Sequence, residues 1–71
     1  IAIFSGNGNN NKFTITHGLI STPSQIIITP LTPDAAGEFY IDADDQNIYV
    51  IYKSPPPQGI NNIKLKWYAK I

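Results

Sequence analysis

The chain of 71 residues has no cysteine, no methionine and no arginine, a single histidine, and only 14% charged residues. Without cysteine, disulfide bonds are excluded and thiols give no information about the redox compartment. Without arginine, and with a net charge of zero, the chain lacks the basic field and the bidentate guanidinium typical of nucleic-acid binders. Its apolar runs are too short for a membrane span. We therefore expect neither nucleic-acid binding nor membrane insertion.

The length favours one domain over residues 1–71, near the lower limit for independent folding. A chain of this size buries only about 60% of its unfolded surface. Such domains usually add a disulfide, a metal or a partner subunit. Since disulfides are excluded and a single histidine provides too few ligands for a metal site, oligomerisation is the favoured source of extra stability. The chain starts at Ile1 rather than methionine, so we expect a fragment of, or a module within, a longer chain.

The C-terminal stretch carries the clearest pattern. From residue 63 onward, apolar and polar side chains alternate with a period of two, which predicts a strand with one apolar and one basic face. The apolar positions are Ile63, Leu65, Trp67, Ala69 and Ile71, and the polar positions are Lys64, Lys66, Tyr68 and Lys70.

Five further strands are predicted from β-branched and aromatic runs between turn residues. They are Ile1–Phe4, Lys12–Thr16, Gln25–Leu31, Glu38–Ala43 and Gln46–Lys53. The first two are expected to form a hairpin around an Asn/Gly loop. Pro30 predicts a strand end or a sheet edge, and a short helical turn is expected after Pro33. The proline run within Ser54–Gly59 predicts an extended crossover to the other sheet.

The fold class that follows is all-β: a small antiparallel β-sandwich, jelly-roll-like, of about six strands. A minimal barrel is the alternative. Two strands, Gln25–Leu31 and Gln46–Lys53, are apolar on both faces. One face of each would then lie on the core and the other against a neighbouring subunit.

His17 is the one side chain that titrates near neutrality. The favoured interpretation is a partly buried ring that bonds a backbone group and pins the turn before Gly18. The alternative is a metal site on a threefold axis, with one imidazole from each subunit. No cofactor is expected.

Three aspartates, Asp42, Asp44 and Asp45, cluster at a predicted hairpin tip. An oxygen cage for calcium is one interpretation, but their spacing matches no EF-hand loop, and turn chemistry is favoured. Serines occur only in predicted loops, and the spacing indicates no acidic partner for the histidine. We therefore expect a protein that is not an enzyme.

Tyrosines exceed what so small a core accommodates, so some are expected at protein interfaces or stacked on sugar rings. The expected subunit contact consists of Ile27, Tyr49, Ile51 and Tyr52. The loops expected to face a receptor contain Asn7, Asn9, Asn10, Asn11, Asp44, Asp45 and Gln46.

The motifs, taken in order, resemble a small β domain of phage and archaeal-virus structural proteins, found at the ends of tail fibres, spikes and head fibres. The matching stretches are Phe4–Gly8, Phe13–Leu19, Thr22–Pro30, Asp34–Tyr40, Pro56–Asn62 and Trp67. They cover nearly the whole chain, and their order is more specific than any one of them. Thr16 departs from the pattern, because many relatives have proline before the histidine.

The resemblance implies a homotrimeric β-sandwich on a virion surface, in the style of trimeric H-type-lectin-like heads. The function it implies is virion assembly as a fibre, spike or capsid-decoration module, with attachment to a host glycan or protein. Two alternatives remain: a carbohydrate-binding module, and a cellular surface-filament subunit that donates Ile1–Phe4 to a neighbour. The implied partners are copies of the chain and other virion proteins, in an extracellular location.

Overall fold

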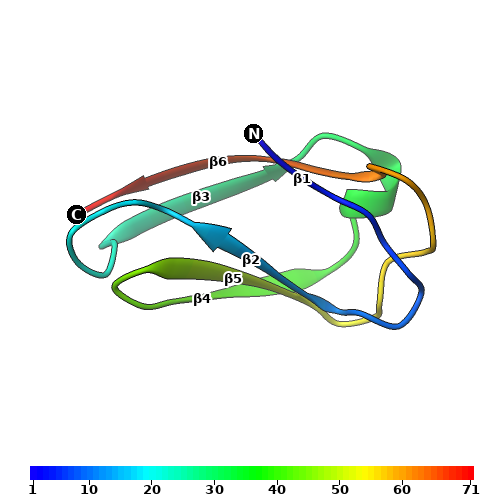
Figure 1. Cartoon of the computed structure of the whole chain (residues 1–71), viewed down its shortest axis with the longest axis horizontal. Coiled ribbons are helices and arrows are strands. Elements are labelled where there is room, and N and C mark those ends of the chain that lie inside the picture. Colours follow the sequence, from blue (N-terminus) through cyan, green and yellow to red (C-terminus); the bar gives the residue numbers. More distant parts are fainter.

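The computed structural model describes all 71 residues, from Ile1 to Ile71. Two three-stranded antiparallel sheets pack face to face, one with strand order β1-β6-β3 and the other with order β2-β5-β4 (Figure 1). We name them the β6 sheet and the β5 sheet after their central strands. The molecule measures 33 × 18 × 17 Å. The predicted all-β antiparallel sandwich of six strands is confirmed.

In the β6 sheet, the central strand β6 (Ile63–Lys70) pairs with β1 (Ala2–Phe4) on one side and β3 (Gln25–Pro30) on the other. Residues of β6 are alternately covered and exposed, as the period of two predicts. Trp67 lies on the covered face and packs against the core. Since β3 is an edge strand and ends at Pro30, the missing donor of proline costs no ladder bond.

In the β5 sheet, the central strand β5 (Asn47–Tyr52) pairs with β2 (Lys12–Thr16) and β4 (Phe39–Ala43). The predicted helical turn is the 3₁₀ helix η1 (Pro33–Ala35), which connects the two sheets. None of the helical segments has the length and apolar character needed to span a bilayer.

The core lies between the sheets, and its aromatic rings come from both. Phe4 lies 5.1 Å from Phe13, and Tyr52 meets Phe13 and Phe39 edge-on, with ring centroids 5.8 and 5.3 Å away. Fully burying side chains of this size contributes about 1.5–3 kcal/mol each. The buried hydrophobic residues are Phe13, Ile15, Ala35, Ile48, Val50, Tyr52, Ile63 and Leu65.

The predicted hairpin of the first two strands is wrong. β1 pairs with β6, whereas β2 pairs with β5, so the two strands belong to different sheets. Phe4 and Phe13 therefore meet across the core instead of lying side by side in one sheet. Alternation predicts which side of a strand is apolar, but it does not predict which strand lies beside it. The one hairpin of neighbouring strands is β4–β5.

The proline-rich segment between β5 and β6 passes from one sheet to the other, as predicted. Asn62 anchors its end. Its Oδ1 accepts a hydrogen bond from the Gly6 amide (2.9 Å), and its Nδ2 donates to the Pro57 carbonyl (3.0 Å) and to Asp34 Oδ2 (2.9 Å). One amide side chain thus joins the first loop, the crossover and the 3₁₀ helix.

Candidate functional surfaces

His17 is buried, and both of its ring nitrogens bond the backbone. Nε2 donates to the carbonyl oxygen of Asp44 (2.9 Å), and Nδ1 accepts from the amide of Leu19 (3.0 Å). Because a carbonyl only accepts and an amide only donates, these bonds require the neutral tautomer with its hydrogen on Nε2. This is the turn-pinning arrangement that the sequence favoured. A metal ion on a threefold axis would have to displace one of the two bonds.

The Asp44 carboxylate closes the β4–β5 hairpin. Its Oδ1 accepts from the amides of Gln46 (2.9 Å) and Asn47 (2.7 Å), and its Oδ2 accepts from the Tyr49 hydroxyl (2.7 Å). The Tyr49 bond first, and the two amide bonds second, hold the pKa of Asp44 below its ordinary value. The favoured turn chemistry therefore describes this carboxylate. Nowhere in the chain do three or more His, Cys, Asp or Glu side chains converge as a metal site requires.

The asparagine loop between β1 and β2 is exposed, and some of its side chains form hydrogen bonds with the backbone of the same loop. Asn7 Oδ1 accepts from the amides of Asn9 (2.8 Å) and Asn10 (2.6 Å). Asn11 Nδ2 donates to the carbonyl of Tyr52 (3.3 Å) and so ties the loop to β5. Asn9 is the member of this loop whose side chain makes no hydrogen bond, so it is the one most available to an external ligand.

The two loops expected to face a receptor lie at opposite ends of the β5 sheet. The asparagine loop leads into Lys12, whose register partner is Ile51 near the end of β5. The hairpin tip of residues 44–46 leads into the start of β5, where Asn47 lies opposite Thr16 at the end of β2. Figure 1 shows this separation along the long axis. The two loops therefore form two separate tips rather than one site.

The residues expected to form a subunit contact do not lie together. Ile27 is 49% exposed on the outer face of the β6 sheet, whereas Tyr49 and Ile51 lie on the outer face of the β5 sheet. Tyr52 is 2% exposed, and its hydroxyl donates to the Ala35 carbonyl inside the core (2.7 Å). Its assignment to a subunit contact is wrong, because the side chain lies on the inner side of β5.

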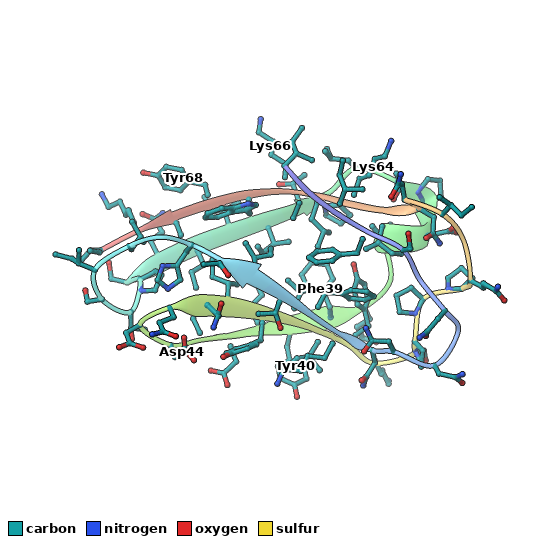
Figure 2. The ribbon with its side chains drawn as sticks, in the orientation of Figure 1. Phe39, Tyr40, Asp44, Lys64, Lys66 and Tyr68 are labelled. Atoms are coloured by element: carbon teal, nitrogen blue, oxygen red, sulfur yellow. The ribbon has the colours of Figure 1, made fainter.

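The outer face of the β6 sheet combines lysine with exposed apolar groups. Its central row, on β6, consists of Lys64, Lys66, Tyr68 and Lys70. In register, Ile3 lies beside Lys64 and Ile27 lies beside Tyr68. Figure 2 shows Lys64, Lys66 and Tyr68 projecting from β6, away from the core.

The outer face of the β5 sheet combines tyrosine with carboxylates. Tyr40, at 63% exposed, lies beside Ile51, and Asp42 lies beside Tyr49. The Lys12 ammonium sits 4.5 Å from the centroid of the Tyr49 ring, a cation–π contact. In Figure 2, Tyr40 and Asp44 project on the side opposite to the lysines.

A shallow depression of about 370 Å³ adjoins the start of β4 and is lined by Glu38, Phe39, Tyr40 and Lys53. It presents an aromatic ring, a carboxylate and an amine to solvent. The Lys53 ammonium lies 3.7 Å from the Glu38 carboxylate across it.

Sequence reasoning considered Asp42 of β4 only for an oxygen cage for calcium and assigned no function to the lysines of β6. The alternation of charge and tyrosine at every second position was a signal in both segments. The sequence could not show that these two rows lie on opposite outer faces, because this depends on the packing of the two sheets.

Comparisons of the chain with protein-family models, with curated protein sequences and with solved structures find no match. The viral resemblance of the sequence motifs therefore stays a prediction.

Proposed function

We propose that the chain is a structural module of a virion fibre, spike or capsid decoration that associates as a homotrimer and contributes to host attachment. The resemblance of the sequence motifs supports the viral part of this proposal. The association part rests on one observation: large apolar side chains stay exposed on the outer strand faces although the core is fully formed.

Those exposed strand residues are found on both sheets. They include Ile3, Ile27 and Tyr68 on the β6 sheet and Tyr40 on the β5 sheet, each between 49% and 63% exposed. Single exposed apolar residues are ordinary, but exposed apolar groups that lie side by side on a sheet face are typical of surfaces that a partner covers. A domain of this size also gains stability from a partner subunit.

The test is the mass of the purified chain in solution, measured by light scattering at micromolar concentration with and without a chelator. We expect three copies. We also expect the chelator to leave the mass unchanged, because both His17 nitrogens already bond the backbone. A monomer would contradict the trimer, and a trimer that dissociates with chelator would make His17 a metal ligand.

A matched pair of variants ties the association to the sheet face. Ile27→Thr keeps a β-branched residue in β3 but removes apolar surface, so we expect weaker association. Ile60→Thr, at a loop position that is 90% exposed, should leave the mass unchanged.

The depression beside Tyr40 favours carbohydrate binding as a second candidate function. An exposed ring next to a carboxylate and an amine is suited to stacking on a sugar and bonding its hydroxyls. A glycan array tests it: binding that Tyr40→Ala removes and Tyr68→Ala preserves would support it, and an array without hits from a folded protein would contradict it. The surface-filament alternative has less support, because β1 already pairs with β6 of its own chain.

A further inference from the structure

Two rows of side chains, one on each outer face of the sandwich, have matching chemistry. The first row follows β6 and consists of Lys64, Lys66, Tyr68 and Lys70. The second follows β4 and the residues that flank it, and consists of Glu38, Tyr40, Asp42 and Asp44. From Lys70 back to Lys64, the first row consists of a positive charge, a tyrosine and two further positive charges. Read forwards from Glu38, the second has the same order with the opposite charge.

The spacing of the two rows also agrees. Each row uses every second residue of an extended segment, so its side chains recur about every 6.7 Å. The rows therefore match position by position when β6 of one copy runs antiparallel to β4 of another.

The lysines of the first row have no acidic neighbour on their own face. Their register partners on β1 and β3 include Ile3, Gln25 and Thr29, none of which is charged. The chain has one salt bridge, Lys53 to Glu38 on the other sheet, and both of its side chains are 77% exposed. An exposed pair of this kind contributes little, so it leaves Glu38 available to a partner.

The acidic residues gather on the opposite side of the sandwich. Four of the five acidic residues lie on β4 or next to it, and the β5 sheet adds Lys12 and Lys53. Four acids and two lysines give this side a net charge of −2, while three lysines give the β6 sheet +3, and Asp34 accounts for the remaining −1. Although the net charge of the chain is zero, its two outer faces therefore carry net charges of opposite sign.

We propose that the outer face of the β6 sheet is the docking surface for the outer face of the β5 sheet of a second copy of this chain. Opposite charges then face each other along the two rows, with tyrosine on tyrosine among them. Sheets that pack face to face lie about 10 Å apart, which long side chains span. The facing pairs are Lys70 with Glu38, Tyr68 with Tyr40, Lys66 with Asp42, and Lys64 with Asp44.

The contact also has an apolar component. Ile27 lies beside Tyr68 in register, and Ile51 lies beside Tyr40, so each tyrosine brings an isoleucine from the neighbouring strand. The broad faces of a molecule of 33 × 18 × 17 Å are of the order of the ~800 Å² per partner that stable interfaces bury. Tyrosine in particular is enriched in such interfaces.

This inference rests on the proposed self-association and names the surfaces that carry it. The contact is heterologous, because each copy uses a different face on each side. Such contacts close into a ring when the two contact faces are inclined to each other, whereas parallel faces on opposite sides of a sandwich extend as an open row.

A charge exchange within one chain tests the facing of Lys66 and Asp42. Lys66→Asp alone or Asp42→Lys alone places like charges opposite each other, and each should weaken association by about tenfold or more. The double variant Lys66→Asp/Asp42→Lys reverses the pair in every copy and should restore association. Both positions are exposed, and circular dichroism checks that each variant folds. Asp44 is left unchanged because it closes the hairpin.

The control is the double variant Lys70→Asp/Asp42→Lys, which has the same net charge but a mismatched position. It should associate at least as weakly as the single variants, because like charges then face each other at two positions instead of one. Association of the unmodified chain should also weaken from low to high salt, because exposed charges are screened.

Restoration by the matched pair only would support the inference. Single variants that leave association unchanged, or equal restoration by both double variants, would overturn it while leaving a trimer intact. A chain that stays monomeric but binds vesicles of anionic phospholipid, or heparin, through its lysine row would also overturn it. Restoration in an assembly of other than three copies would support the docking surfaces and contradict the trimer.

Discussion

The hydroxyl of Tyr49 donates a 2.7 Å hydrogen bond to Oδ2 of Asp44, and this bond links the outer face of β5 to the hairpin turn. It lowers the pKa of Asp44 and, in turn, raises the pKa of Tyr49 above its ordinary value. The bond therefore exists only in the pH range between two titrations. It is lost in acid when the aspartate is protonated and in alkali when the tyrosine is deprotonated.

The acid limb gives the first prediction. Because the pKa of Asp44 is lower in the folded state, its contribution to stability is complete above the ordinary aspartate range and is lost as pH falls through the lowered value. Asp44→Asn should lower the melting temperature near pH ~7 and reduce its further fall toward pH ~2. Thermal unfolding followed by circular dichroism at both pH values measures this.

Asp45→Asn is the matched control, because Asp45 is the exposed neighbour in the same turn and its side chain makes no hydrogen bond. This substitution should change the pH dependence of the melting temperature less than Asp44→Asn does. An equal effect of the two substitutions would contradict the special role of Asp44.

The second prediction concerns the buried hydroxyl of Tyr52, which donates to the Ala35 carbonyl (2.7 Å). Tyr52→Phe keeps the ring contacts with Phe13 and Phe39 but leaves that carbonyl without its partner, at a cost of about 1–3 kcal/mol. Burial raises the pKa of Tyr52, so the contribution of the neutral side chain is complete below the ordinary tyrosine range and is lost as pH rises through the raised value.

Urea unfolding of Tyr52→Phe at neutral pH measures the cost, and a scan into alkali should show a shallower loss of stability than in the unmodified chain. Tyr68→Phe, on the outer face, should leave the free energy of unfolding unchanged. Loss of stability from Tyr68→Phe but not from Tyr52→Phe would be inconsistent with this core.

The third prediction concerns Asn62, whose side chain bonds Gly6, Pro57 and Asp34. Asn62→Ala should lower the free energy of unfolding by about 1–3 kcal/mol, because it leaves the Gly6 amide and the Pro57 carbonyl without this partner. Asn62→Asp should cost more, since it loses both donors and faces the Asp34 carboxylate. Chemical denaturation measures both, with Asn9→Ala on the exposed loop as the neutral control.

The fourth prediction uses a glycine pair. A Cβ at Gly6 would overlap the backbone carbonyl oxygen of Pro57, which cannot move without shifting the crossover. A Cβ at Gly37 would instead meet the Tyr52 ring at an ordinary contact of 3.5 Å. Gly6→Ala should therefore destabilise the fold by several-fold more than Gly37→Ala in the same unfolding experiment. Equal costs would show that the first loop does not pack on the crossover as described.

Local sequence predicted much of this structure, because the signals concerned act over a few residues. The alternation in residues 63–70 and in Lys12–Thr16 correctly predicted which side chains face the core, whereas Ile71, beyond the end of β6, is 55% exposed. Pro30 and Pro33 marked a strand end and a helical turn. His17 bonds backbone groups at a turn, as its position beside Gly18 suggested.

Tertiary structure alone decided which strands are neighbours and which faces are opposite. Ala2–Phe4 could have paired with any strand that offers unpaired backbone groups. It pairs with Ile63–Leu65 near the other end of the chain, and this places the Phe4 ring against Phe13 across the packed core. The separation of Ile27 from Tyr49, and of the lysine row from the acidic row, follows from that same packing. Periodicity determines the side of each strand, whereas the partner of each strand depends on contacts that no local pattern encodes.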